Sequence, residues 1–518
     1  MTPMRYDLFD SPPAKLPGNV PAIRIQANAD RWFPAAEALH AEHARFLTLW
    51  GADDRDRDNC FRVYAAWLLP GTVVVVENVI RDVANPRYTS LAPLFPAASR
   101  MERAVYDLLG ISTEELDARG WLRHGGWPES VFPLRRDFDG NQEYPVTSEP
   151  YPFVQVEGDG VHEIAVGPVH AGTIEPGHFR FSVVGEKVLR LEERLGYTHK
   201  GVAKLFQAMP QTEGHWLAAR LSGDSAVAFS WAWCVALESL TGTACPPRAT
   251  ALRALALEHE RLANHLGDLG ALGNDAGFAF GLTQFSQLKE DLLRANAKLF
   301  GERYLMNFIQ PGGVARDLPE DASDLLFPQY LKLEERVANL RSIYDEHAGI
   351  QDRFRETGRL DHELAGRLGA LGLAARASGI PCDLRVDLPW PPYDKVKPEI
   401  ATQTIGDVAA RVQVRFDEIF ASLRLCRLLL AGLSAGQVQT GVPVAEPNCA
   451  GIGLIEGWRG PAMIVLETGP EGTIRSCHAH DPSWQNWPLL EHAILGNLVP
   501  DFPLINKSFN LSYSGQDG

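Results

Sequence analysis

The segment GPVHAGTIEPGHFRF, residues 167–181, brings two imidazoles and one carboxyl group into a short loop. Glu175 lies between His170 and His178, and the proline that follows Glu175 restricts its backbone to extended conformations. A carboxyl group held in a rigid turn near imidazoles suits proton transfer, because such groups can be tuned to titrate near neutral pH. The simpler alternative is an ordinary turn with an exposed glutamate, and the spacing alone leaves both open.

Two four-residue windows have the spacing at which some metalloenzymes place CxxC pairs, but neither contains a cysteine. The first runs from Ser222 to Ser225 in ARLSGDSAVAF, and the second runs from Ser512 to Gly515 in LSYSG. Residues three apart on a helix face one neighbour, so we expect the two hydroxyls of the first window to point the same way. Asp224 and a glycine lie inside that window, and a glycine-mediated helix crossing with satisfied hydroxyls is the simpler interpretation.

The motif LEHERLANHL, residues 257–266, invites comparison with the HExxH helix of zinc proteases. His259 and His265 are six positions apart instead of four, which places them roughly 120° apart around a helix. Glu258, Arg261 and His265 share one helix face. We therefore expect a buried, ion-paired seam between helices and no zinc site.

The elements that must position these residues predict an α+β fold class. The β-rich runs FRVYAAWL and TVVVVENVI predict a hairpin at Pro70-Gly71, and ASRMERAVYDLLG predicts a helix that ends at Gly110. A polar, proline-containing stretch around residues 139–153 has the composition of a linker. We place the N-terminal α+β domain, the linker and the second domain at residues 1–145, 146–160 and 161–518.

The second domain is expected to combine a small β-layer with a multi-helix bundle. Two strands in HFRFSVVGEKVLRLEERLG are joined at Gly185-Glu186, where glycine suits a two-residue turn. Apolar residues at steps of three and four predict six long helices. These segments lie near residues 213–241, 248–272, 283–301, 322–350, 351–376 and 403–434. The last 80 residues return to short strands, GPAMIVLET and GTIRSCHAH, and a proline-containing end.

Bulk properties exclude several classes of function. The net charge of −16 over 518 residues disfavours a nucleic-acid surface, which needs clustered lysine and arginine. We find no signal peptide and no run of about 18 uncharged apolar residues, the length that a membrane-spanning helix needs. The seven cysteines are too far apart for CxxC-type metal or cluster sites, and GxGxxG and Walker loops are absent.

Taken together, the motifs resemble a known family. TSLAPLFPAASRMERAVYDLLGI and WPESVFPLRRDF resemble the C-type (30 kDa-like) subunit of complex I, the NADH–quinone oxidoreductase. The rest resembles the D-type (49 kDa-like) subunit and the large subunit of membrane-bound, energy-converting nickel–iron hydrogenases. This part of the resemblance lies in GPVHAGTIEPGHFRF, YTHKGVAKL, ARLSGDSAVAF, EHERLANHLGDLG, FIQPGGV, EGWRGPAMIVLETGPEGTIRSCHAHDPS and DFPLINKSFNLSYSG. Nearly the whole chain is covered, as a C/D fusion similar to component G of hydrogenase-4-like complexes.

The resemblance gives the two windows a meaning. Hydrogenases of this family read RxCGxC and DPCxxC, and alignment puts Ser222 and Ser225 at the first pair and Ser512 and Gly515 at the second. Nickel–iron assembly relies on soft thiolates, whereas a serine hydroxyl stays protonated at neutral pH and glycine offers no ligand. We therefore expect no metal at this site and no hydrogen activation, and we expect the three serines to line a vacated cofactor cavity.

Complex I D-type subunits also lack these cysteines, and the resemblance implies that the emptied cavity became a quinone pocket. Two departures bear on this inference. The complex I loop resembles GPxHxxxHG; His170 matches its first histidine, but Ile174 stands where the second would be. The quinone-headgroup tyrosine has no match in PQTEGHWLAAR, residues 210–220. The loop instead carries the hydrogenase-like Glu175.

The resemblance implies a peripheral-arm subunit of an oxidoreductase, on the cytoplasmic face of the inner membrane and without a transmembrane segment. Glu175 would carry protons, His170 would line the cavity, and Arg220 and Asp224 would shape it. The expected partners are a small iron–sulfur subunit, a ferredoxin-like subunit and antiporter-like membrane subunits. Iron–sulfur clusters would sit on those partners, a quinone is a possible ligand, and NAD(H) would enter only through the wider complex. The electron donor, NAD(P)H, formate or ferredoxin, stays open, and no independent activity is expected.

Two alternatives remain. The chain would be a catalytically silent scaffold if an apolar, fully packed space separated Ser222 and Ser225 from the tail. An open polar cavity that reaches Glu175 would favour the enzymatic interpretation. A nickel–iron hydrogenase with unusual ligands is the third possibility, and stoichiometric nickel in the purified complex would establish it.

Overall fold

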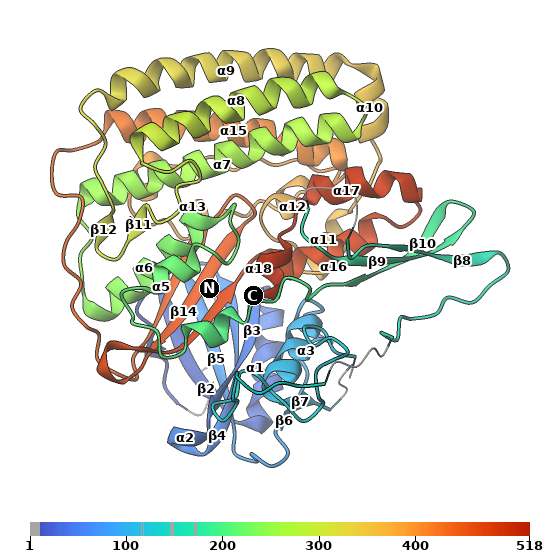
Figure 1. Cartoon of the computed structure of the whole chain (residues 1–518), viewed down its shortest axis with the longest axis vertical. Helices are drawn as coiled ribbons and strands as arrows, with labels where there is room; N and C mark the ends of the chain where they lie inside the picture. The colour runs from blue at the N-terminus through green and yellow to red at the C-terminus, as the bar shows by residue number, and fades with distance from the viewer. Residues whose placement is uncertain (1–10, 115–116, 118, 146–149, 170–173) are drawn as a thin grey trace.

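Five strands form the N-terminal sheet of the computed structural model, which describes residues 11–114, 117, 119–145, 150–169 and 174–518 (Figure 1). The sheet order is β1-β2-β5-β4-β3, with bounds Ala14–Lys15, Ala22–Ala27, Thr72–Ile80, Cys60–Leu69 and Arg45–Asp54. β2 and β5 are parallel, and the other neighbours are antiparallel. The predicted hairpin at Pro70-Gly71 is confirmed between β4 and β5, where Gly71 takes a φ of 83°.

Helices cover one face of this sheet. α1 (Ala29–Ala41) begins at Asn28, whose side chain accepts from the Arg31 amide, and α3 (Ala98–Leu109) ends at Gly110 in the left-handed conformation, as predicted. Buried aromatic side chains such as Trp32, Phe46 and Trp67 fill the space between sheet and helices. Short elements complete the domain: α2 (Arg55–Asp58), β6 (Arg87–Tyr88) and β7 (Ser112–Thr113).

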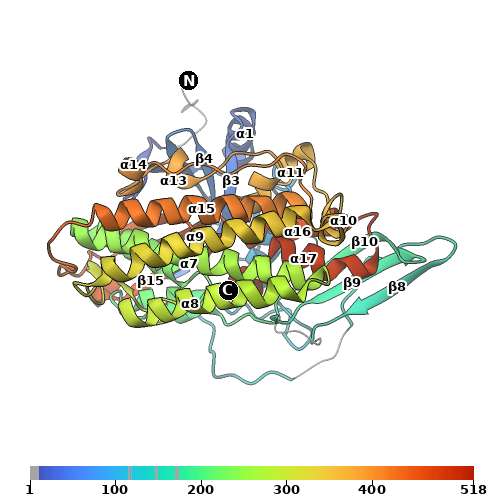
Figure 2. The ribbon, with the colours of Figure 1, turned by 90° about the horizontal axis from the view of Figure 1, so that it is seen from above.

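A three-stranded sheet projects from the second domain (Figures 1 and 2). Its order is β10-β9-β8, with bounds Lys187–Arg194, His178–Val184 and Val161–Val166. The predicted Gly185-Glu186 turn is confirmed, because β9 and β10 pair directly across it with Val184 opposite Lys187. The base of this sheet packs on the C-terminal helices through Phe179 and Phe181.

Four long helices lie side by side and form the bundle (Figures 1 and 2). They are α7 (Pro247–Asp275), α8 (Ala279–Leu299), α9 (Ala322–Glu346) and α15 (Val408–Ala431), and each matches a predicted segment. Proline stands at the first position of α7, where its missing N–H is not needed. α6 (Ala226–Thr241) packs instead on the C-terminal sheet and is apolar on nearly every face.

Two of the six predicted helices are broken in the structure. The segment 213–241 contains the short α5 (Gly214–Ala218) and then α6, so that Ser222 and Ser225 lie in a turn and not on a helix. The segment 351–376 divides into α10 (Ala348–Phe354), α11 (His362–Arg367) and α12 (Gly372–Ala377). Gly358 and Gly369 take positive φ angles, and Asp361 caps α11 by accepting from the Leu364 amide.

The last 80 residues form strands and then helices. β13 (Ala450–Glu456), β14 (Pro461–Thr468) and β15 (Ile474–His480) make an antiparallel sheet, which confirms the two predicted strands and adds a third. The proline-containing end, for which no helix was predicted, is helical, with α16 (Ser483–Ala493), α17 (Phe502–Phe509) and α18 (Tyr513–Asp517). Smaller elements are α4 (Val202–Phe206), β11 (Ile309–Gln310), β12 (Gly313–Val314), α13 (Leu384–Asp387) and α14 (Tyr393–Val396).

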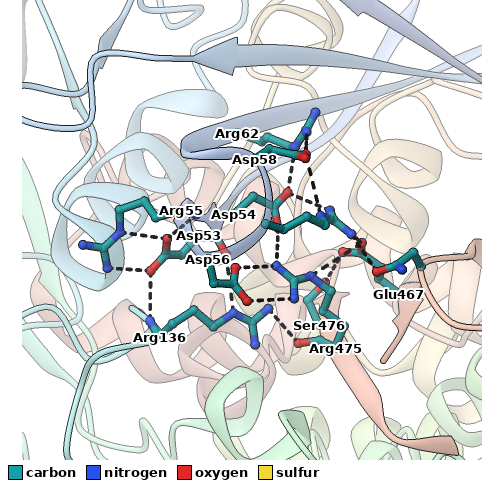
Figure 3. Close-up of polar contacts among 12 residues, drawn as sticks. Asp53, Asp54, Arg55, Asp56, Asp58, Arg62, Arg136, Glu467, Arg475 and Ser476 are labelled. Carbon is teal, nitrogen blue, oxygen red and sulfur yellow. Dashed lines mark hydrogen bonds and ion pairs between the residues drawn. The ribbon is translucent and has the colours of Figure 1, made fainter. Parts of the chain in front are cut away.

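A network of ion pairs joins the N-terminal sheet to the C-terminal sheet (Figure 3). Arg475 on β15 donates to Asp54 Oδ1 and to Asp56 Oδ1, each at 2.7 Å. Arg57 pairs with Glu467 Oε1 on β14 at 2.6 Å. The turn that ends β3 thus binds two strands of the C-terminal sheet.

The motif LEHERLANHL lies on α7 and forms the expected buried seam. Glu258 accepts from Arg385 Nη1 at 2.9 Å and from the Tyr393 hydroxyl at 2.6 Å. His265 Nε2 lies 2.7 Å from Glu418 Oε2 on α15. All of these side chains are buried, so the motif holds helices together. In the part of the chain that the structure describes, we find no helix with both the length and the apolar character needed to traverse a bilayer.

Candidate functional site

The two serine windows meet in space, although they are far apart in the sequence. Ser222 Oγ lies 2.8 Å from Ser512 Oγ, across a separation of 290 residues. Ser512 is the N-cap of α18 and accepts from the Gly515 amide at 2.9 Å. The Trp487 indole donates to the Ser512 carbonyl at 3.3 Å and fixes this end of the tail. Both serines are almost fully buried.

A cavity of about 880 Å³ opens beside this contact. One part of its wall is polar and carries ionisable groups: Glu175, Asp224, Asp268, Lys289, Arg459 and Lys507. Another part is apolar: Val166, Ile174, Phe179, Leu282, Phe502 and Leu511. Ser222, Ser512 and Ser514 also line it. The space therefore combines proton-carrying groups with a surface that an apolar molecule can contact.

Asp224 and Arg459 form the central ion pair of the cavity. Arg459 donates from Nη1 and Nη2 to the two carboxylate oxygens of Asp224 at 2.7 and 2.6 Å. Its guanidinium lies 3.9 Å from the ring centroid of Trp458, and the Trp458 indole donates to the Asp224 carbonyl at 2.8 Å. Burial alone would raise the pKa of Asp224, but the charge and hydrogen bonds of Arg459 outweigh it and lower that pKa.

The turn at residues 222–225 is held by its neighbours. The Ser225 amide donates to the Ser222 carbonyl at 3.0 Å, which closes the turn. Glu260 on α7 then accepts from the Val227 amide at 2.7 Å and caps the start of α6. This local capping explains why the predicted continuous helix does not form. Burial raises the pKa of Glu260 to about 8.

The Glu175 loop presses against the tail. Glu175 Oε2 accepts from the Ser514 amide at 3.1 Å, and its side chain is otherwise exposed to the cavity. Gly177 is in close contact with the Tyr513 ring, which leaves no room for a side chain at that position. His178 Nδ1 donates to the Gly167 carbonyl at 3.1 Å, and burial lowers the pKa of His178.

The other predicted site residues have different fates. Arg220 is exposed and donates to the Trp216 carbonyl at 2.7 Å and to Asn307 Oδ1 at 2.9 Å, so the structure does not bring it to this cavity. The arginine that lies beside Asp224 in the cavity wall is Arg459. Ser225 is buried behind the wall, with its Oγ 3.4 Å from Arg459 Nη1. His170 lies outside the described residues.

Several cavity residues were not identified from the sequence. Asp268 accepts from Asn510 Nδ2 at 2.7 Å and pairs with Lys507 at 3.1 Å and with Arg415 at 3.0 Å. Burial opposes its ionisation, but these cations lower the pKa of Asp268 to about 2. Lys507 lies in the motif LINKSF next to the second serine window, and this proximity was the available signal. Asp268 lies one helical turn beyond His265, on the expected seam.

Comparisons with known proteins agree with this geometry. The respiratory-chain NADH dehydrogenase 30 Kd subunit family matches residues 25–144, and the 49 Kd subunit family matches residues 275–448. Formate hydrogenlyase subunit 5 of Escherichia coli (strain K12) is 32% identical over 494 residues, covering 93% of this chain and 86% of that protein. The chain belongs to the family of fused complex I-type C/D subunits. This family also contains hydrogenase components.

Other members of the C/D family show the same breadth. Hydrogenase-4 component G of Escherichia coli (strain K12) is 30% identical, over 92% of this chain and 85% of that protein. The fused C/D protein of the NADH-quinone oxidoreductase of Bacteroides thetaiotaomicron is 27% identical, over 81% and 84%. The fold resembles a chain of the membrane-bound sulfane sulfur reductase (MBS), an archaeal respiratory membrane complex. Its TM-score is 0.65 at 23% identity, over 69% of this chain and 99% of that chain.

The hydrogenase members of the C/D family raise the question whether a nickel–iron pair fits here. The 2.8 Å between Ser222 Oγ and Ser512 Oγ is a hydrogen-bond distance, so these oxygens bond to each other. At Gly515 a β-carbon would lie 2.6 Å from Asp481 Oδ2, so Asp481 occupies the space of a fourth ligand. The described residues that line the cavity include no cysteine. These donors do not fit a thiolate-held metal pair.

Proposed function

We propose that the chain is the peripheral subunit of a membrane-bound, complex I-like or hydrogenase-4-like respiratory oxidoreductase. In this proposal its cavity couples electron transfer from a partner iron–sulfur subunit to proton or quinone chemistry. The other partners are a ferredoxin-like subunit and antiporter-like membrane subunits, at the cytoplasmic face of the membrane. Oxidation of NAD(P)H or another low-potential donor takes place elsewhere in the complex. The observation that carries the proposal is the polar cavity reaching from Asp224 to Glu175.

Support for an active cavity over a silent scaffold comes from its content. A scaffold needs a packed interior, whereas about 880 Å³ of space separates the 222–225 turn from parts of the tail. Carboxylates and cations face this space, and Glu175 accepts a hydrogen bond from the Ser514 backbone amide. Ionisable groups around an open cavity are typical of sites that move protons.

The divided wall supports an amphiphilic acceptor such as a quinone. A quinone has a polar headgroup with two carbonyl acceptors and an apolar tail. Lys289, whose pKa is lowered by burial, offers a donor at the polar part of the wall. Val166, Leu282 and Phe502 offer apolar contact. The oxygen donors at the former ligand positions support a cavity without nickel and iron.

Glu175→Gln in the assembled complex tests the proposal. Glutamine keeps the size and the acceptor for the Ser514 amide but cannot carry a proton. We expect proton-coupled turnover to fall by roughly tenfold or more. Glu186→Gln is the matched control, because Glu186 lies exposed in the β9–β10 turn away from the cavity. Unchanged turnover and proton coupling in Glu175→Gln would remove the catalytic role and favour the scaffold. Stoichiometric nickel in the purified complex would favour the hydrogenase alternative.

A further inference from the structure

The hydroxyls that replace the expected metal ligands form a directed hydrogen-bond chain. Ser222 Oγ donates to Asp224 Oδ1 at 2.8 Å, because a carboxylate oxygen only accepts. A hydroxyl has one hydrogen, so Ser512 must be the donor in the 2.8 Å bond between the two serines. Ser512 keeps acceptor capacity and uses one lone pair for the Gly515 amide at 2.9 Å. In this row of hydrogen bonds, the hydroxyl hydrogens of Ser512 and Ser222 both point toward Asp224.

The row of hydrogen bonds extends toward Glu175 along the same cavity wall. Ser514 Oγ lies 3.5 Å from Ser512 Oγ, at the outer limit of a hydrogen bond. The Ser514 amide donates to Glu175 Oε2 at 3.1 Å, which holds the two residues together. Glu175, Ser514, Ser512, Ser222 and Asp224 all line the cavity. We call the three hydroxyl-bearing residues, Ser222, Ser512 and Ser514, the serine row.

We propose that the serine row is a proton relay between Glu175 and Asp224. The inference rests on the proposed function, since it assigns the path by which this cavity moves protons. Serine relays a proton without ionising, because it forms one O–H bond as it breaks another. Two bonds of 2.8 Å join Ser512, Ser222 and Asp224, and Ser514 Oγ lies 3.5 Å from Ser512 Oγ. Cysteine thiols at these positions would be weak donors and acceptors.

The transfer balances without any electron moving. A protonated Glu175 gives its proton to a water molecule in the cavity, that water passes one of its own protons to Ser514 Oγ, and the proton of Ser514 passes to Ser512 Oγ. The proton of Ser512 passes to Ser222, and the proton of Ser222 passes to Asp224 Oδ1. Each serine ends as a neutral hydroxyl, Glu175 becomes a carboxylate, and Asp224 becomes a carboxyl group.

Arg459 makes the end of the relay an outlet. Protonated Asp224 leaves the buried Arg459 guanidinium without its counter-charge, which is unfavourable. Asp224 is 39% exposed and faces the cavity, so it can pass the proton to a basic oxygen of a molecule bound there. The hydroxyls then turn back to their original direction.

A purely structural role would use the same bonds to pin the tail to the 222–225 turn. The two roles differ in what a substitution changes. Loss of a structural bond lowers stability and leaves the rate of the assembled complex unchanged. Loss of a relay member slows proton-coupled turnover in a complex that still assembles, and it changes the solvent isotope effect.

The experiment uses variants of Ser222 in the full complex. Ser222→Ala removes the last member of the row, Ser222→Cys keeps the size with a weak donor, and Ser222→Thr keeps a hydroxyl. Ser230→Ala is the matched control, because Ser230 is a buried serine of α6 whose hydroxyl bonds only to backbone carbonyls of its own helix. Turnover, proton translocation and the solvent isotope effect are measured, and assembly is checked by co-purification.

We expect Ser222→Ala and Ser222→Cys to slow proton-coupled turnover by roughly tenfold or more. Ser222→Thr should recover most of the rate, and Ser230→Ala should stay within about twofold. If the alanine variant does not assemble, the near-isosteric cysteine variant carries the test. Unaltered turnover and isotope effect in an assembled Ser222→Ala or Ser222→Cys complex overturn the relay. The proposed function survives that result if Glu175→Gln still slows turnover, and it fails with the relay if Glu175→Gln is also without effect.

Discussion

Arg459 donates hydrogen bonds from Nη1 and Nη2 to Asp224 Oδ1 and Oδ2, at 2.7 and 2.6 Å. The pair lies beside the serine row in the cavity wall, and Asp224 is the only carboxylate that Ser222 contacts among the described residues. A bidentate contact fixes orientation as well as charge. The electrostatics around Asp224 therefore depend on the arginine side chain at position 459, and not merely on a positive charge there.

Arg459→Lys should show this dependence. Lysine keeps the charge but cannot bond both carboxylate oxygens in one plane. We expect a loss of about 1–2 kcal/mol in the free energy of unfolding, below the cost of breaking a fully buried pair because Asp224 is 39% exposed. The pKa of Asp224 should rise, so the acidic limb of the pH–rate profile should move to higher pH. An unchanged profile would contradict the assigned role of Arg459.

Arg475→Met should weaken the contact between the N-terminal sheet and the C-terminal sheet. The substitution removes the bonds to Asp54 and Asp56 and leaves Asp54 buried with less neutralising charge. We expect the free energy of unfolding to fall by about 2–4 kcal/mol in urea denaturation. The control is Arg359→Met, because Arg359 is exposed. Equal stability of the two variants would show that the ion pairs of Arg475 contribute little to the free energy of unfolding.

The ion pairs of Arg475 also predict that the stability of the protein falls in acid. Burial alone would raise the pKa of Asp54, but Arg475 and Arg57 outweigh it and lower that pKa. Arg475 also lowers the pKa of Asp56. The unfolded state therefore binds protons first as pH falls. The stabilisation is complete above the unfolded aspartate pKa of about 3.9 and is lost as pH drops through the lower native values.

Denaturation measured between pH 6 and pH 3 checks this sign. The free energy of unfolding should decline toward pH 3 in the unaltered chain. Asp54→Asn should be less stable at pH 6 and show a shallower decline, because one of the titrating groups is gone. A steeper decline in Asp54→Asn would mean that other carboxylates dominate the acid response.

Gly515→Ala should be destabilising for a steric reason. Its new β-carbon would lie 2.6 Å from Asp481 Oδ2 and 2.9 Å from Ser512 Oγ. Overpacking of this kind costs about 1–3 kcal/mol, measured as a drop in Tm. The penalty should shrink in an Asp481→Ala background, where the space is open. Full additivity of the two substitutions would show that Asp481 does not occupy that space.

Much of the fold could be predicted from local patterns. The hairpin at Pro70-Gly71, the stop of α3 at Gly110 and the four bundle helices follow from turn chemistry and apolar spacing. The 222–225 turn could not be predicted, because the Glu260 side chain that caps α6 comes from another helix. The helical tail was missed because its apolar residues pack on elements far away in the sequence, such as β9, where Phe179 contacts Phe502.

The candidate site was predictable only in part. The meeting of Ser222 with Ser512 and the position of Glu175 beside the tail agree with the alignment of family motifs. Arg220 was assigned to the cavity on the family resemblance alone, but in the structure its side chain donates to Asn307. Arg459 comes from the loop between β13 and β14, and no local pattern links that loop to Asp224.

The contact between Arg475 and Asp54 spans 421 positions of the chain. At a translation rate of 5–20 residues per second, the N-terminal sheet leaves the ribosome roughly 20–80 s before the strand that will cover its acidic turn. During that interval the surface around Asp54 and Trp50 lacks the Arg475 and His478 side chains that contact it in the folded protein. This surface of the N-terminal sheet is made early, and it is among the last surfaces to be covered as the protein folds.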